Sequence, residues 1–135
     1  MFIIIAGGGK IGYYLTRELL DKGHETVLIE QMPRKVAALT EKLGDVVLEG
    51  DAADATTLEQ AGIVRADIVI AVTGHDEDNL VICQVAKRKF HVPQTIARIN
   101  NPKNERIFQR LGIDSTVSTT KLVLNAIEQG IPSHV

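Results

Sequence analysis

The sequence has little of several features that mark common classes of protein. It contains a single cysteine, Cys83, so no internal disulfide can form and nothing indicates an oxidising compartment. Aromatic residues make up only 4% of the chain, which argues against a base-stacking surface for single-stranded nucleic acid. The formal net charge is -2, so there is no electrostatic reason to expect nucleic acid or an anionic membrane as a partner.

Long hydrophobic runs are also missing. No apolar run approaches the roughly 18 residues that predict a membrane-spanning helix, and the apolar N-terminal run is too short for a signal peptide. The 135 residues are 44% hydrophobic and 24% charged, which is ordinary for a soluble domain with one core. We therefore expect a cytoplasmic protein that does not insert directly into a membrane.

What the sequence does contain is a regular alternation of short apolar runs with longer stretches of helical period. The expected strands are residues 2–6, 26–29, 46–48, 68–72, 95–99 and 113–118. A helix is expected after each strand, and the last one covers residues 120–129. Most of the strand runs are apolar throughout, which is typical of strands covered on both faces. The pattern predicts an α/β fold: a Rossmann-like, doubly wound, six-stranded and mainly parallel sheet with helices on both faces.

The stretch "GGGKIG" lies between the first expected strand and the first expected helix. Gly7, Gly9 and Gly12 fit the G-x-G-x-x-G pattern of dinucleotide-binding proteins, and the strand–turn–helix context supports that interpretation. Gly7 permits a sharp turn, Gly9 lets a phosphate approach the backbone, and Gly12 lets the helix pack closely on the strand. The first helical turn then offers free N–H groups to an anion. The alternative is a plain glycine turn.

The second strand ends in an acid, Glu30. In the dinucleotide-binding pattern, an acid about 20 residues beyond the glycines accepts hydrogen bonds from both hydroxyls of an adenosine ribose. Such a carboxylate also repels a 2′-phosphate, so NADP is disfavoured. The alternative is a solvated acid at the end of a strand.

Polar and small residues follow the third and fourth expected strands. Ligands of open parallel sheets lie outside the carboxyl ends of the strands, so Thr73 and Gly74 are candidate wall residues that offer backbone groups and little bulk. Asp51 is a candidate partner of the adenine amino group, with Ala52 supplying backbone contacts. Asp51 can equally be a turn or capping residue.

Two cations are candidates for contact with phosphates. Lys10 lies within the glycine loop next to Ile11, which we include in the candidate site, but Lys10 can also be a solvent-facing lysine. Arg98 ends the fifth expected strand among apolar neighbours and needs an anionic partner. That partner is either a nucleotide phosphate or an acid across an interface.

Residues 75–78, "HDED", are the one stretch that resembles a set of metal ligands. Acids in the first turn of a helix complement its dipole, and we take this as their role. A divalent cation shared with nucleotide phosphates is the alternative. We assign no metal site and no catalytic residue.

Three stretches go well beyond a generic dinucleotide pattern: "EGDA" after the third strand, "VTG.DE.N" after the fourth and "AR.N.P.N" after the fifth. With the glycine stretch, they resemble the RCK (KTN, or TrkA-N) domain, which regulates potassium channels and Trk-type potassium transporters in prokaryotes. The resemblance covers nearly the whole chain. It implies that the glycines, Glu30, Asp51, Thr73 and Gly74 bind nucleotide, that Lys10 contacts phosphates, and that Arg98 lies near the phosphates or the subunit interface.

The resemblance also implies a regulatory protein rather than an enzyme. Its expected ligand is NAD(H), ATP or ADP, and its expected partner is the membrane subunit of a potassium channel or transporter, which would place it at the inner face of the cell membrane. The apolar residues of the last helix are expected to form a homodimer or a higher ring, or else to cover their own sheet. Residues 1–135 are expected to be one N-lobe without the second, C-terminal lobe of many members. The alternative function is an NAD-dependent oxidoreductase, or its cofactor domain, which would need a substrate pocket and a proton-transfer residue.

Overall fold

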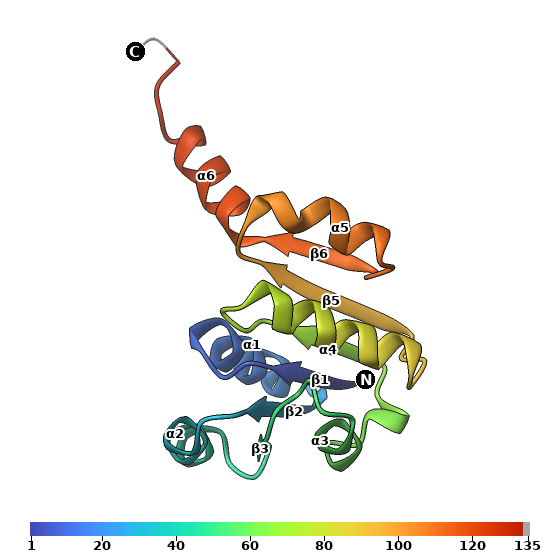
Figure 1. Cartoon of the computed structure of the whole chain (residues 1–135). Coiled ribbons are helices and arrows are strands. Elements are labelled where there is room, and N and C mark those ends of the chain that lie inside the picture. Colours follow the sequence, from blue (N-terminus) through green and yellow to red (C-terminus); the bar gives the residue numbers. More distant parts are fainter. Residues whose placement is uncertain (134–135) are drawn as a thin grey trace.

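Strands and helices alternate along residues 1–133, the part of the chain that the computed structural model describes (Figure 1). The strands are β1 (Phe2–Ala6), β2 (Glu25–Glu30), β3 (Val47–Glu49), β4 (Ile68–Ala71), β5 (Gln94–Ile99) and β6 (Ser115–Ser118). The α-helices are α1 (Lys10–Asp21), α2 (Pro33–Leu43), α3 (Ala55–Gln60), α4 (Asp76–Arg88), α5 (Glu105–Arg110) and α6 (Thr119–Gln129). Short 3₁₀ turns at Ile63–Arg65 and Pro102–Asn104 precede β4 and α5.

The six strands form one sheet in the order β3-β2-β1-β4-β5-β6, and every neighbouring pair is parallel. The prediction of a doubly wound, mainly parallel sheet is therefore confirmed. β2 and β3 lie on one side of β1, whereas β4, β5 and β6 lie on its other side. The direction in which strands are added to the sheet therefore reverses between β1 and β4. Ligands of such sheets bind at the carboxyl ends of the strands next to this reversal.

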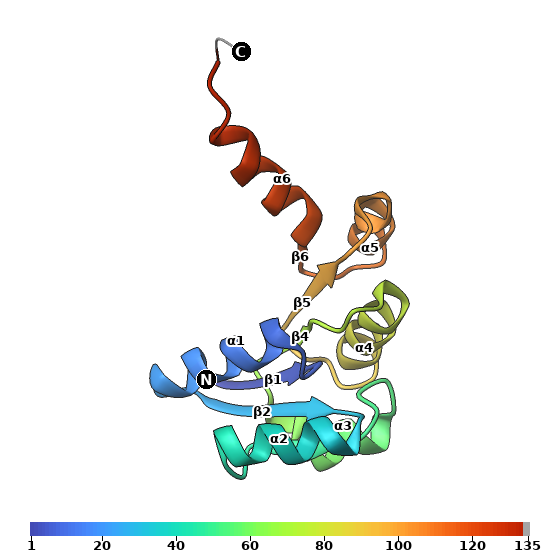
Figure 2. The ribbon, with the colours of Figure 1, turned by 90° about the vertical axis from the view of Figure 1, so that its left-hand side faces the viewer.

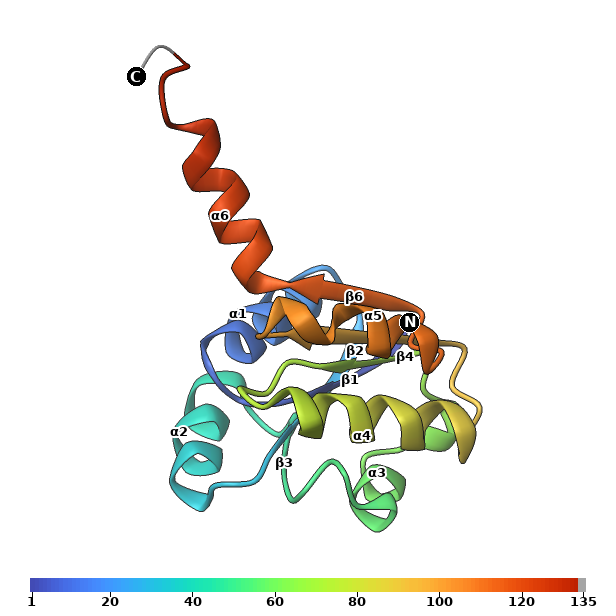
Figure 3. The same cartoon turned by 45° about the horizontal axis from the view of Figure 1, so that its top comes forward.

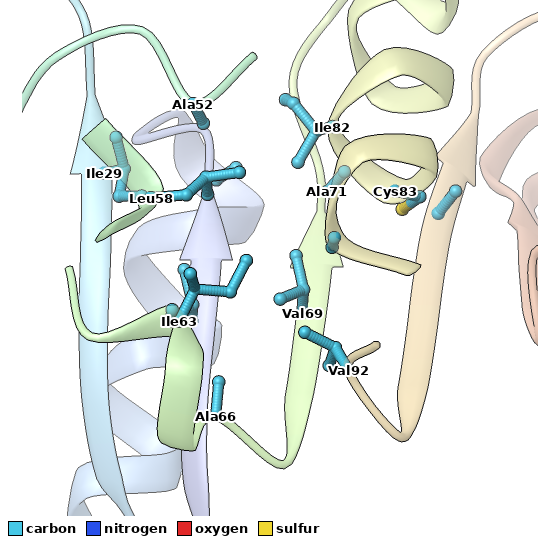
Figure 4. Packing of buried hydrophobic residues seen from close by; sticks show 14 of the residues in the cluster. Ile29, Ala52, Leu58, Ile63, Ala66, Val69, Ala71, Ile82, Cys83 and Val92 are labelled. Atoms are coloured by element: carbon cyan, nitrogen blue, oxygen red, sulfur yellow. The ribbon is translucent and has the colours of Figure 1, made fainter. Parts of the chain in front are cut away.

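Helices cover both faces of the sheet, α1 and α2 on one side and α3, α4 and α5 on the other (Figure 2). β1 supplies both hydrophobic cores, because successive side chains of a strand point to opposite faces. Ile4 packs in the cluster that contains Leu58 and Ile82, seen in part in Figure 4. Ile3 and Ile5 pack in the cluster under α1 and α2. All five residues of β1 are buried, which explains the uninterrupted apolar run.

The last helix does not cover its own sheet, so that alternative is wrong. α6 begins directly after β6 and extends away from the other elements (Figures 1 and 3). None of its residues is buried, and Leu122, Val123 and Ile127 are each more than half exposed. Within residues 1–133, the apolar side chains of α6 are therefore left mostly exposed.

One helix differs from the prediction, whereas α4 agrees with it. α4 begins at Asp76, and its first turn holds Asp76, Glu77 and Asp78, as expected for acids that complement a helix dipole. The stretch expected as one helix over residues 102–111 divides into the 3₁₀ turn and α5. Within residues 1–133, no helix is long and apolar enough to cross a membrane.

Candidate functional site

A cavity of about 310 Å³ lies at the carboxyl ends of β1, β2, β3 and β4. This volume is at the lower end of the range for small-molecule sites, about 300–1,000 Å³. Several of the predicted site residues line it, namely Gly7, Glu30, Asp51, Ala52, Thr73 and Gly74. The topology brings them together because each of them lies at or just beyond the end of one of these strands.

Close contacts between backbones explain two of the glycines. Gly7 has a φ of 113°, and a Cβ atom at this position would lie 2.9 Å from the backbone nitrogen of Thr73. A Cβ atom on Gly12 would lie 1.8 Å from the carbonyl oxygen of Gly7. The loop after β1 therefore fits directly against the loop after β4, and α1 packs on it without a gap.

Gly8, which has no role in the G-x-G-x-x-G pattern, holds the acid at the end of β2. Its backbone N–H donates a hydrogen bond of 2.8 Å to Glu30 Oε1, and the N–H of Met32 donates one of 2.9 Å to Glu30 Oε2. The side chain of Glu30 is fixed in this way, with 8% of the residue exposed, while it lines the cavity. Each carboxylate oxygen has a second lone pair, so both remain able to accept a hydrogen bond from a ligand hydroxyl.

Asp51 combines the two roles that the sequence left open. Its Oδ1 accepts a hydrogen bond of 2.9 Å from the N–H of Ala53, which makes it a turn residue, and it also lines the cavity. Ala52, buried beside it, contributes to the wall. The short, polar loop after β3 therefore forms one side of the cavity.

Thr73 lines the cavity, but its N–H and hydroxyl groups are already engaged. Its backbone nitrogen and its hydroxyl donate to Asn79 Oδ1 at 2.9 and 2.6 Å, and its carbonyl oxygen accepts from Asn79 Nδ2 at 3.1 Å. The contribution of Thr73 backbone groups to a ligand site therefore stays a prediction, and these groups already have partners within the domain. Gly74 differs, because a Cβ atom there would meet nothing within 4 Å, so a ligand can approach its backbone.

Asp76, the first residue of α4, is buried beneath the loop after β5. Burial alone raises the pKa of its carboxyl group. Hydrogen bonds from the N–H groups of Asn100 and Asn101 and from the side chains of Asn104 and Asn100 outweigh this effect and hold the pKa below its usual value. Asp76 is therefore a structural anion that already has its partners. Among the described residues, no group of three or more His, Cys, Asp or Glu side chains is placed to hold a metal ion.

The remaining predicted residues lie outside the cavity lining. Gly9 and Lys10 line a shallow groove between α1 and α2, and Gly12 lies beneath the loop. The cation that lines the cavity is Lys35 on α2, which was not among the predicted site residues. Its only signal is its place shortly after the end of β2, because the docking of α2 decides where its side chain lies.

Arg98 and Ile11 line a different hollow, an apolar groove of about 400 Å³ on the α1 side of the sheet. The groove is lined by Ile11, Leu15, Ile70, Val72, Ile96, Arg98, Val117, Thr119 and Leu122. Arg98 Nε is buried there and is the one buried side-chain nitrogen or oxygen among residues 1–133 that has no hydrogen-bond partner. Two anionic partners were predicted for Arg98, a nucleotide phosphate and an acid from across an interface. Its position in the groove, outside the cavity, favours the acid from across an interface.

Comparison with known proteins places this arrangement in a family. The family model described as "TrkA-N domain" matches residues 3–119. The Trk system potassium uptake protein TrkA homolog of Methanothermobacter thermautotrophicus is 36% identical over 129 residues, which are 96% of this chain and 59% of the relative. This chain thus spans less than two thirds of the length of that relative.

Two solved structures have the same fold and contain a nucleotide. GsuK bound to ADP matches 94% of this chain and 32% of its own, with 29% identity and a TM-score of 0.81. The GsuK channel bound to NAD matches 90% of this chain and 22% of its own, with 25% identity and a TM-score of 0.80. The match to the family model over most of the chain, together with the all-parallel sheet and the glycine loop at its centre, shows that this chain belongs to the TrkA-N domain family.

Proposed function

We propose that this domain binds NAD(H), ATP or ADP in the cavity at the carboxyl ends of β1–β4. The observation that carries the proposal is the position of Glu30, which lines the cavity with both oxygens oriented by the N–H groups of Gly8 and Met32. An adenosine ribose placed there gives its hydroxyls to a fixed carboxylate. The nucleotides bound by GsuK, NAD and ADP, share this adenosine group.

The glycine loop is the proposed site of the phosphates. The N-terminal turn of α1 carries backbone N–H groups that no helical carbonyl accepts, and the helix dipole favours an anion there. Gly9 lies at this end, and a Cβ atom on it would meet nothing within 4 Å, so the space beside its backbone is open. Lys10 and Lys35, which line the adjoining groove, are the proposed cations for the phosphates, while Asp51 and Ala52 face the adenine.

We further propose a regulatory role in potassium transport rather than catalysis, as the naming of the relative as a Trk potassium uptake protein suggests. The partner would be the membrane subunit of a potassium transporter or channel, and the domain would lie at the inner face of the cell membrane. A nucleotide changes the state of such an assembly only by its different affinity for two conformations.

The apolar groove and α6 suggest how two copies associate. α6 presents Leu122, Val123, Ala126 and Ile127 to solvent, and no helix of the described residues 1–133 covers the groove on the α1 side of the sheet. We propose a homodimer, alone or within a ring, in which α6 of each copy packs on its partner copy. Burial of several apolar side chains at about 1.5–3 kcal/mol each favours this association.

Isothermal titration calorimetry with ADP, ATP and NADH tests the nucleotide site. We expect saturable binding with one nucleotide per chain, and a strong loss of affinity in Gly9→Val, because the valine occupies the open space at the proposed phosphate position. A Cβ atom at this position meets nothing within 4 Å, so the variant should keep the fold of the wild type, which its melting temperature checks. Absence of binding to the wild type, or full affinity in Gly9→Val, would contradict the proposed site.

A further inference from the structure

The stretches that carry the family resemblance include residues 72–79 and 97–104. Both contain polar residues that do not line the nucleotide cavity, so nucleotide binding does not explain their presence. Asp76, Asn79, Asn100 and Asn104 are absent from the lining of the cavity. In the structure they form one hydrogen-bonded group between the start of α4 and the loop after β5, which we call the polar cluster. Its position between the cavity and the last helix suggests a role.

Asn79 connects the polar cluster to the cavity wall. It is 0% exposed, and its amide binds the N–H, hydroxyl and carbonyl groups of Thr73. The same amide nitrogen donates a hydrogen bond of 3.0 Å to the carbonyl oxygen of Arg98 on β5. Because every polar atom of this buried amide is engaged, Thr73 cannot shift relative to β5 without breaking hydrogen bonds away from water.

Asp76 connects the same wall to the segment before α5. Its Oδ1 accepts hydrogen bonds of 2.6 and 2.9 Å from the backbone and side-chain nitrogens of Asn100. Its Oδ2 accepts hydrogen bonds of 2.9 and 2.8 Å from the N–H of Asn101 and the side chain of Asn104. Asp76 directly follows His75, which lines the cavity, so one buried carboxylate joins the cavity wall to residues 100–104.

Residues 100–105 in turn hold the first turn of α6. The hydroxyl of Thr120 donates a hydrogen bond of 2.9 Å to the carbonyl oxygen of Asn100. The ammonium group of Lys121 lies 3.2 Å from a carboxylate oxygen of Glu105. α6 has no buried residue, so these two contacts, the edge of the apolar groove at Leu122 and the junction with β6 determine the direction in which it leaves the domain.

We propose that the polar cluster relays occupancy of the nucleotide cavity to α6. A nucleotide that contacts Gly74 and His75 favours one position of the loop after β4, and the cluster carries that position to residues 100–105 and so to the base of α6. This inference rests on the proposed nucleotide site and adds a route by which the site controls the proposed dimer helix. Both ends of the route contact one element, the hydrogen-bonded segment 100–105, and the proposed coupling requires that this segment has two arrangements that both sites bias.

Hydrogen–deuterium exchange followed by mass spectrometry tests the relay, with calorimetry on the same samples and ADP as the probe. In the wild type, we expect saturating ADP to change the exchange rate of amides in residues 119–129 at least twofold. The double variant Thr120→Val/Lys121→Met removes both contacts of α6 without touching the cavity or the cluster. It should bind ADP with an affinity within twofold of the wild type. The effect of ADP on amide exchange in residues 119–129 should fall by at least half.

The matched control is Thr120→Ser/Lys121→Arg, which keeps a hydroxyl donor and a cation. In this control, ADP should change amide exchange in residues 119–129 as it does in the wild type. A variant at the centre of the cluster, such as Asp76→Asn, also changes the stability of the domain, so the double variant at the edge carries the test. The relay is overturned if ADP binds to the wild type but leaves exchange in α6 unchanged, or if the double variant responds fully. Lack of ADP binding to the wild type would instead remove the proposed nucleotide site, and the relay with it.

Discussion

The backbone N–H of Gly8 donates a hydrogen bond of 2.8 Å to Oε1 of Glu30, and this contact joins the glycine loop to the end of the neighbouring strand. A side chain on Gly8 would displace both neighbouring side chains, because its Cβ would lie 2.6 Å from a methyl carbon of Leu39 and 2.9 Å from the same carboxylate oxygen. The middle glycine of the loop therefore positions the acid, while Gly7 and Gly12 shape the turn. The proposed phosphate and ribose subsites are built as one unit.

Replacement of Glu30 by alanine should weaken both nucleotide binding and folding. The N–H groups of Gly8 and Met32 would lose their acceptor, and an adenosine ribose would lose its partner, each at a cost of about 1–3 kcal/mol in a desolvated site. Calorimetry with ADP measures the first loss and urea unfolding the second. Glu59→Ala, which removes an exposed acid outside the cavity, is the matched control and should change neither. Unchanged ADP affinity in Glu30→Ala would remove this residue from the site.

Acid should destabilise the domain partly through Asp76. The pKa of Asp76 is lower in the folded state than the usual value of about 3.9 that applies after unfolding. Its contribution to stability is therefore complete above the unfolded pKa and disappears as the pH falls through the folded pKa. Urea unfolding at pH values from 7 down to 2.5 should show a smaller loss of stability in Asp76→Asn than in the wild type. Equal losses would mean that the hydrogen bonds to Asp76 do not favour its charged form.

Cys83 should be chemically inert while the domain is folded. Burial raises the pKa of its thiol to about 12, and the side chain is fully buried against the sheet (Figure 4). Because the thiolate is the reactive form, a disulfide reagent at pH 8 should modify the native protein only at the rate of unfolding. The same reagent should react at once in concentrated urea. Rapid reaction of the native protein would show that the core around α4 is open to solvent.

The proposed dimer predicts that charge on the apolar side of α6 produces monomers. Leu122→Asp and Ile127→Asp place a carboxylate on apolar positions of α6 that are more than half exposed, so both variants should still fold. Sedimentation equilibrium should show a dimer for the wild type and a monomer for each variant. Asn125→Asp, at an exposed polar position of the same helix, should leave the dimer intact. A monomeric wild type, or dimeric aspartate variants, would contradict the association through α6.

Much of this architecture can be predicted from the sequence, because fully buried parallel strands appear as apolar runs and their order follows from the alternation with helices. The position of Glu30 beside the glycine loop follows from the same topology. The face of the sheet on which Arg98 lies could also be predicted, because successive residues of β5 point to opposite faces. Ala97 and Ile99 point into the core that α4 and α5 cover, so Arg98 lies on the other face.

Other features depend on packing that the sequence does not specify. The apolar pattern of α6 is the same whether the helix covers its own sheet or another molecule, so its direction could not be predicted. Lys35 lines the cavity only because α2 docks where it does. Asn79 has a polar side chain on a helix face that packs against the sheet, and only the structure shows that Thr73 and Arg98 satisfy its amide.

A crystal structure of the domain grown with ADP tests the nucleotide site most directly. The account predicts ADP in the cavity at the carboxyl ends of β1–β4, with both ribose hydroxyls within hydrogen-bond distance of the Glu30 carboxylate. The phosphates should lie against the glycine loop at the start of α1. ADP found elsewhere on the domain, or crystals in which the cavity holds no nucleotide at saturating ADP, would contradict the account.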